Sequence, residues 1–170
     1  MSSPLQNQAV ALLVCSGFEE QPFVKIQQAL TAAGASVKVI SRDSGLTNGW
    51  AGSNWGLSYP VDAPLSGTLA VDFDIMVIPD GSRHTEMLFN DAHGKRIINA
   101  FIRENVPSLV IGSGVDALKA HDLLDDDINS DDGPVLNKTL VIAPVDADNS
   151  QVISLLAEAM DNAKNIEAAA

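Results

Sequence analysis

Short apolar runs alternate along this chain with segments of helical periodicity. Five runs have the length of strands, and four of them are almost continuously apolar, which is typical of strands buried on both faces of a parallel sheet. The fifth run, 36–41, alternates and is rich in β-branched residues, so it is also predicted to be a strand. The strands are expected over residues 9–15, 36–41, 73–79, 107–112 and 139–143.

Apolar residues at helical spacing follow most of these strands. Phe23, Ile26 and Leu30 recur at intervals of three and four residues, and Gly34 is suited to the end of that helix. Strands that alternate with helices predict an α/β fold, a flavodoxin-like three-layer sandwich whose mostly parallel sheet carries helices on both faces. The helices are expected over residues 22–33, 85–105 with a break near His93 and Gly94, 115–120 and 150–165.

Two segments lack this alternation. Residues 42–68 hold both tryptophans and several glycines. Within them, 46–51 and 55–60 predict a small β-hairpin across the turn 52–54. Residues 122–132 are strongly acidic and predict a solvated loop.

The length and composition predict one acidic domain. The 170 residues suffice for a single core, and the ends, 1–7 and 166–170, are expected to fray. The net charge of −12 disfavours nucleic acid and anionic membranes, because both require a basic surface. No apolar run approaches the roughly 20 residues that cross a bilayer. The N-terminus does not resemble a signal peptide and Cys15 is the only cysteine, so we expect a cytoplasmic protein.

Candidate ligand contacts lie where the third and fourth expected strands end. In doubly wound sheets, ligands bind beyond the carboxyl ends of the strands. Glycines at such turns leave space and free backbone N–H groups, so a small-molecule site is expected at Gly81, His84, Gly112, Ser113 and Gly114.

Three local motifs carry a resemblance to a known family. The first strand leads into the sequence Gly-Phe-Glu-Glu at 17–20, the third into Pro-Asp-Gly at 79–81, and the fourth into a tight Gly-Ser-Gly turn at 112–114. In this order they resemble the PfpI/ThiJ family, over roughly residues 8–165. The resemblance implies the class I glutamine-amidotransferase-like fold.

A more specific similarity lies around the third strand. The stretch 66–81, with Gly56 and Pro60 before it and 107–112 after it, is most similar to the C-terminal domain of large-subunit catalases. That resemblance implies a structural, assembly or chaperone-like role, with a catalase core as partner. It implies no haem site in this chain, and no cofactor is expected. Because members of this fold usually form dimers, a homodimer is expected too.

The resemblance also shows what this chain lacks. Active PfpI/ThiJ members place a Cys at the turn after the fourth strand, a His beside it and a Glu in the loop after the first strand. These positions fall on Gly112, on Ser113 and near Pro22. Glycine supplies neither a nucleophile nor a proton, so no catalytic residue is expected. The degenerate site comprises Gly112, Ser113, Glu19, Glu20 and His84.

Two residues keep an enzymatic alternative open. Ser113 is a hydrolase or amidase nucleophile if His84 acts as its base, whereas the competing interpretation makes it the N-cap of a helix from Val115. Cys15 is a candidate redox thiol, although a cysteine inside an apolar run is more typical of a small buried hydrophobe.

Acidic residues suggest further sites but weakly. Glu19 and Glu20 form either an acid–base pair or the start of a helix, where negative charge is favourable. Residues 127–138 alternate like a calcium loop, but Asp132 stands where glycine is needed and Lys138 where glutamate is needed. No metal site is therefore expected.

The aromatic residues Trp50, Trp55 and Tyr59 cluster in the glycine-rich segment. They predict either a partner contact or packing within the hairpin. The sequence thus leaves three functions open. The first is the non-catalytic domain, the second a hydrolase, amidase or thiol enzyme using Ser113 or Cys15, and the third a small-molecule binding module.

Overall fold

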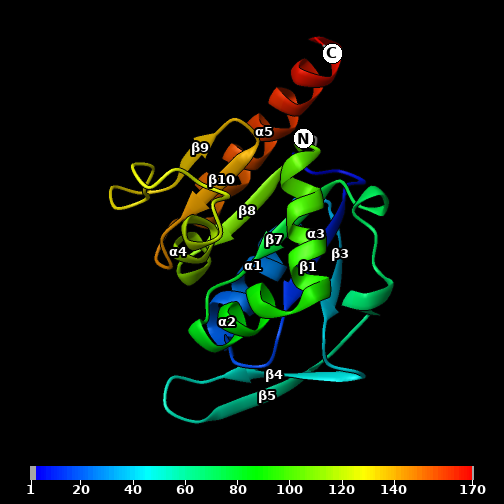
Figure 1. The fold of residues 1–170 in the computed structure, drawn as a ribbon, viewed down its shortest axis with the longest axis vertical. Helices are drawn as coiled ribbons and strands as arrows, with labels where there is room; N and C mark the ends of the chain where they lie inside the picture. Colours follow the sequence, from blue (N-terminus) through cyan, green and yellow to red (C-terminus); the bar gives the residue numbers. More distant parts are fainter. Residues whose placement is uncertain (1–2, 170) are drawn as a thin grey trace.

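A computed structural model describes residues 3–169 (Figure 1). All five strands that the hydrophobic pattern predicts are present, with ends within two residues of those expected. Two short strands of the main sheet, β6 (Ala63–Pro64) and β9 (Val135–Asn137), were not expected. The main sheet contains β1 (Ala9–Val14), β3 (Ser36–Ser41), β6 (Ala63–Pro64), β7 (Ile75–Ile78), β8 (Ser108–Ile111), β9 (Val135–Asn137) and β10 (Leu140–Ala143).

The strand order confirms the doubly wound topology. Along the sheet it runs β6-β3-β1-β7-β8-β10-β9. Every neighbouring pair is parallel except β10 and β9, which pair antiparallel. The chain is therefore an α/β flavodoxin-like sandwich, and the carboxyl ends of its parallel strands share one edge.

Helices cover both faces of this sheet (Figure 1). They are α1 (Glu20–Ala32), α2 (Ser82–Asn90), α3 (Ala92–Arg103), α4 (Ser113–Ala120) and α5 (Asn149–Ala169), with the short 3-10 helices η1 (Leu65–Gly67) and η2 (Ala70–Asp72). Within residues 3–169, none of the helices combines the length and hydropathy that a membrane span requires.

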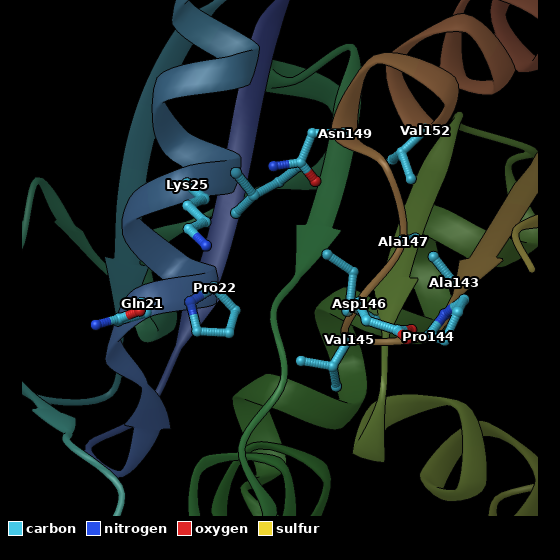
Figure 2. A pocket seen from close by; sticks show the side chains of 12 residues that line it. Gln21, Pro22, Lys25, Ala143, Pro144, Val145, Asp146, Ala147, Asn149 and Val152 are labelled. Atoms are coloured by element: carbon cyan, nitrogen blue, oxygen red, sulfur yellow. The ribbon is translucent and has the colours of Figure 1, made fainter.

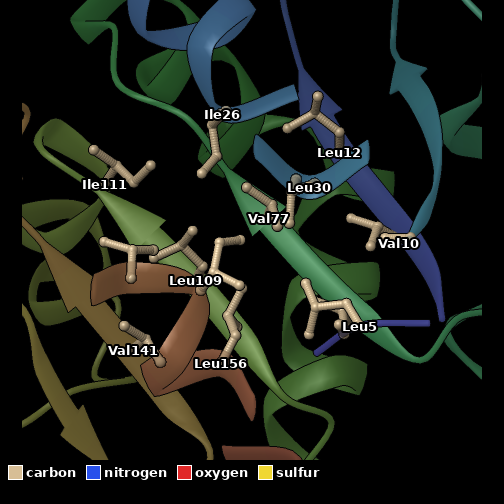
Figure 3. Packing of buried hydrophobic residues seen from close by; sticks show 14 of the residues in the cluster. Leu5, Val10, Leu12, Ile26, Leu30, Val77, Leu109, Ile111, Val141 and Leu156 are labelled. Carbon is tan, nitrogen blue, oxygen red and sulfur yellow. The ribbon is translucent and has the colours of Figure 1, made fainter. Parts of the chain in front are cut away.

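The core is split into two layers by the alternation of β1. Leu12 and Val14 point to the side covered by α1 and α5, where Figure 3 shows Leu12 among other aliphatic side chains. Leu13 and Cys15 point to the side covered by α2, α3 and α4. Because successive side chains of a strand alternate between faces, a continuously apolar run is needed to fill both layers.

The break between α2 and α3 lies earlier than the sequence predicted. A helix over 85–105 with a break near His93 and Gly94 was expected, but the break is at Asp91. The Asp91 side chain accepts the backbone N–H groups of His93 at 2.9 Å and Gly94 at 3.0 Å. This N-cap stabilises a new helix start at that point.

Both ends differ from the expected frayed tails. Leu5 is fully buried, and its backbone N–H donates to Ala33 O at 2.9 Å. Asn7 N–H donates to Gly34 O at 3.1 Å, so residues 3–7 are held against the end of α1. At the other end α5 continues to Ala169. Residues 1, 2 and 170 lie outside the described residues.

The expected hairpin belongs to a second, smaller sheet. It contains β2 (Phe18–Glu19), β4 (Leu46–Trp50) and β5 (Trp55–Pro60), in the order β2-β4-β5. The pair β4 and β5 is antiparallel and confirms the hairpin, whereas β2 pairs parallel to β4 and was not predicted. The hairpin extends away from the main sheet in Figure 1.

Candidate functional site

Gly112 forms the sharp turn between β8 and α4. Its φ of 65° and ψ of −119° are dihedrals that side chains other than glycine rarely adopt. The Gly112 N–H donates to Ala143 O at 2.9 Å, which ties the turn to the end of β10. The turn has the elbow geometry that exposes a nucleophile in other α/β proteins, but the residue at its tip has no side chain.

The Asp80 carboxylate occupies the space beside this elbow. A β-carbon built on Gly112 would lie 2.6 Å from Cγ of Asp80 and 2.9 Å from Cγ2 of Val145. The Ser113 N–H donates to Oδ1 of Asp80 at 2.8 Å and holds the carboxylate in place. A side chain at position 112 would therefore have to displace Asp80.

Ser113 does not have the contacts of a catalytic serine. It is the first residue of α4, and its side chain makes no cap, so the expected N-cap role is wrong; Gly112 is the N-cap residue. Its Oγ accepts the Gly81 N–H at 3.1 Å and shares a hydrogen bond of 2.8 Å with the Thr85 hydroxyl. The hydroxyl thus ties α4 to α2, with no histidine or carboxylate among the partners described.

His84 cannot act as the base for Ser113, because both of its ring nitrogens are engaged elsewhere. It is fully buried, its Nδ1 accepts the Cys15 N–H at 3.2 Å, and Nε2 lies 2.6 Å from Pro79 O. This pattern assigns the proton to Nε2. Burial lowers the pKa of His84 to about 4, against the smaller opposing effects of Pro79 O and Asp80. His84 therefore is a neutral structural residue.

Cys15 has the environment of a buried hydrophobe. Its side chain is fully buried on the α2–α3 side of the sheet. Burial raises the pKa of the thiol to about 11, and the nearby charge of Arg42 offsets this only in part. Because the thiolate is the reactive form, the thiol is unreactive at neutral pH.

Glu19 and Glu20 are adjacent in sequence but serve different contacts. Glu20 Oε1 accepts the Tyr59 hydroxyl at 2.7 Å and the Leu57 N–H at 3.3 Å, so this carboxylate fastens the hairpin to α1. Glu19 is the N-cap residue of α1 without a side-chain cap, and burial together with the Asp80 charge raises its pKa. The pair therefore marks the start of α1, as the helix-start interpretation predicted, with Glu20 as the acidic residue of its first turn.

The aromatic cluster divides into two parts. Tyr59 of β5 packs on Phe23 of α1 with ring centroids 5.0 Å apart, so it joins the hairpin to that helix. Trp50 and Trp55 meet edge to face at 5.3 Å, and the Arg83 guanidinium lies 4.6 Å from the Trp50 ring centroid. Trp55 keeps 52% of its surface exposed, so a partner contact there stays a prediction.

A cavity of about 250 Å³ opens between the starts of α1 and α5 (Figure 2). A wider groove of about 810 Å³ lies between α1 and the hairpin. Gly81, His84 and residues 112–114 line neither of these two spaces. Hydrogen bonds engage Ser113 with Gly81 and His84 with Cys15, and a ligand site at these residues stays a prediction. The cavity lies at the ends of β8 and β10. The general preference of ligands for the carboxyl ends of parallel strands could have indicated this place.

The acidic loop shows no metal-binding arrangement. In its second half Asp131 N–H donates to Asn129 Oδ1 at 3.1 Å, which is a local turn contact. Across residues 3–169, no three histidine, cysteine, aspartate or glutamate side chains gather as a metal site would require. A solvated loop accounts for this segment.

Gly112→Ala tests the competition between position 112 and Asp80. We expect the substitution to lower the free energy of unfolding by about 3 kcal/mol, because it adds backbone strain and a collision with the carboxylate. In an Asp80→Ala background the same substitution should cost less, about 2 kcal/mol, since the backbone strain and the close approach to Val145 Cγ2 persist but the collision with the carboxylate does not. Urea unfolding of the four proteins measures this coupling; equal costs in both backgrounds would contradict it.

His84 predicts a pH dependence of stability. Its pKa of about 4 in the folded protein is below the ordinary value, so between pH 6.5 and 4 the unfolded chain binds more protons. The contribution of the neutral histidine to the free energy of unfolding is complete above pH 6.5. It decreases as the pH is lowered toward 4, by about 3 kcal/mol at most. Unfolding between pH 7 and 4.5 should show a smaller loss in His84→Gln than in exposed His93→Gln. Equal slopes would refute it.

Several solved structures share this fold. A two-domain protein from Anabaena variabilis, containing DJ-1/ThiJ/PfpI-like and ferritin-like domains, matches with a TM-score of 0.76 at 19% identity over 88% of this chain; the chain spans only 50% of it. Oxidized Toxoplasma gondii DJ-1 matches with a TM-score of 0.72 at 19% sequence identity. The match covers 95% of this chain and 96% of that one. A ThiJ/PfpI domain protein from Brachyspira murdochii matches with a TM-score of 0.73 at 17% sequence identity. The match covers 92% of this chain and 98% of that one.

These identities establish the fold but not an activity. No curated protein sequence matches the chain. The model of the DJ-1/PfpI family matches residues 8–128, which include β1, the Gly112 elbow and the whole of α4. With this match over more than half of its length and with the topology described above, the chain belongs to the DJ-1/PfpI family.

Proposed function

We propose that this chain is a non-catalytic DJ-1/PfpI-family domain with a structural, assembly or chaperone-like role. The observation that carries the proposal is the elbow, where Gly112 has no side chain and the Asp80 carboxylate fills the adjoining space. Nucleophilic catalysis requires a reactive atom exposed to substrate and a base oriented toward it. The elbow supplies the backbone geometry without either group.

The surrounding groups support the same role. His84 is enclosed with both nitrogens engaged, and Glu20 is committed to the hairpin. The Ser113 hydroxyl bonds to Gly81 and Thr85 at the junction of α2 and α4. These three polar groups therefore have structural partners, and none of them is a base oriented toward Ser113.

The finer proposal is kinship with the C-terminal domain of large-subunit catalases. It is supported by the stretch 66–81 and by the loss of the nucleophile at position 112. The Anabaena protein offers a precedent of a related fold joined to a second domain. On this proposal the partners are a second copy of the chain and a haem catalase core, and the location is the cytoplasm.

A small-molecule binding role is the second candidate. The cavity between α1 and α5 is the observation that favours it. The hydrolase, amidase and thiol alternatives have no comparable support, since Ser113 lacks a base and Cys15 is buried with a raised pKa.

Covalent probes test the non-catalytic proposal. We expect a fluorophosphonate to leave Ser113 unmodified and iodoacetamide to leave Cys15 unmodified in the folded protein at pH 8, because neither residue is activated. Unfolding in guanidinium should expose Cys15 to alkylation. Intact-protein mass spectrometry measures both reactions, with Ser53→Cys as a control that places an exposed thiol in the hairpin turn. Rapid labelling of Ser113 or Cys15 in the folded protein would overturn the proposal.

Light scattering tests the proposed partners. We expect the chain alone at micromolar concentration to have the mass of a dimer. When the chain is mixed with the isolated haem core of a large-subunit catalase, gel filtration with light-scattering detection should show a complex of higher mass. A monomer in the first experiment removes the homodimer, and separate elution in the second removes the catalase core as partner.

A further inference from the structure

The cavity beside α1 and α5 adjoins the packed elbow through Ile111 and Val145, but Gly112, Ser113 and Asp80 do not line it. It has a volume of about 250 Å³ and lies over the ends of β8 and β10. Figure 2 shows its two walls, with Lys25 on α1 facing the loop that carries Val145 and Asp146 into α5. A space of this size suits a ligand of roughly five to ten heavy atoms.

The floor of the cavity is aliphatic. It includes Ile26, Ile111 and Val152, which are otherwise core residues with at most 6% of their surface exposed. At the rim, Val145 leaves 49% of its surface exposed, which is unusual for a large aliphatic residue near a concave surface. A short branched hydrocarbon group would cover Val145 and contact the floor.

Two opposite charges line the same cavity without meeting. Lys25 stands on one wall and Asp146 on the other. In the part of the chain that the structure describes, the one ion pair joins Arg103 and Glu104, so Lys25 and Asp146 are more than 4.0 Å apart and neither pairs with another residue. A ligand that bridges them therefore needs one anionic and one cationic group.

We propose that this cavity binds a small aliphatic α-amino acid. The Lys25 ammonium group takes the α-carboxylate, the Asp146 carboxylate takes the α-ammonium group, and the branched side chain lies on Ile111 and Val145. Asn149, which also lines the cavity, adds an amide that can donate to the carboxylate. Binding is reversible and involves no covalent step.

The charge of the protein favours a zwitterion over a simple anion. With a net charge of −12, the overall field repels a free carboxylate from the surface. A zwitterion has no net charge, so it loses nothing to that field and still satisfies both walls. Valine, with its three-carbon branched side chain, has the size that the cavity accepts.

This inference rests on the small-molecule role and not on the assembly role of the domain. It concerns Lys25 and Asp146, whereas the non-catalytic proposal concerns Gly112, Asp80 and Ser113. Failure to bind an amino acid would leave the covalent-probe result untouched. Labelling of Ser113 would likewise leave the cavity and its two charges unchanged.

Titration of L-valine into the ¹⁵N-labelled protein tests the proposal by NMR. We expect shifts concentrated at the amides of residues 21–26 and 143–152 that saturate at millimolar concentration. Isovalerate is valine without its ammonium group and isobutylamine is valine without its carboxylate, so each retains one charge and the branched carbon chain. Both should bind at least about fivefold more weakly than valine, since each forfeits one charged contact.

Matched variants assign the two ends of the ligand. Lys25→Gln should weaken the binding of valine about fivefold and leave the binding of isobutylamine unchanged. Asp146→Asn should weaken the binding of valine and leave the binding of isovalerate unchanged. Lys95 is an exposed lysine on α3, on the opposite face of the sheet. The Lys95→Gln variant should therefore bind valine with the affinity of the unaltered protein. All three substituted side chains are exposed, so we expect the variants to fold normally. Thermal unfolding of each variant checks this.

Three results would overturn the proposal. One is the absence of saturable shifts with valine. Another is equal binding of valine and isovalerate, which would make the cavity a site for anions only. The third is identical valine affinity in Lys25→Gln and Lys95→Gln, which would remove Lys25 from the site.

Discussion

Burial of the parallel sheet on both faces is the constraint on which the rest of this structure depends. Leu12 and Leu13 are neighbours in β1, yet one packs under α1 and α5 and the other under α2 and α3. Because both faces of such a strand must be apolar, polar groups are restricted to strand ends. The Asp80 and Ser113 contacts and the cavity beside Lys25 therefore all lie at one edge of the sheet.

The elbow keeps a sharp strand-to-helix turn although the residue at its tip has no side chain. Gly112 retains the turn between β8 and α4, while Asp80, at the end of the neighbouring β7, supplies the group that lies against it. The carboxylate accepts the first amide of α4, which is the kind of N–H that stabilises anions at helix starts. An anion thus occupies this position, supplied by the adjacent strand end.

The carboxyl edge consequently has a closed part and an open part. In the closed part, hydrogen bonds among Gly81, Thr85 and Ser113 join α2 to α4. In the open part, the walls carrying Lys25 and Asp146 do not meet. The hairpin adds a third surface, held to α1 through the Glu20 contact with Tyr59. Function in this chain is more readily assigned to the open surfaces than to the elbow.

The hydrophobic pattern by itself determined five strands of the main sheet and the doubly wound fold, because strand and helix periods are local properties. The position of Gly112 at the elbow followed from the family resemblance. The hydrophobic pattern could not place the break at Asp91, whose cap is a side-chain contact, or the burial of Leu5 against α1. Only the tertiary structure decided that His84 bonds to Cys15 and Pro79 rather than to Ser113, and that Asp80 adjoins Gly112. Such contacts depend on the packing of side chains from separate strand ends, and sequence spacing does not specify how those side chains meet.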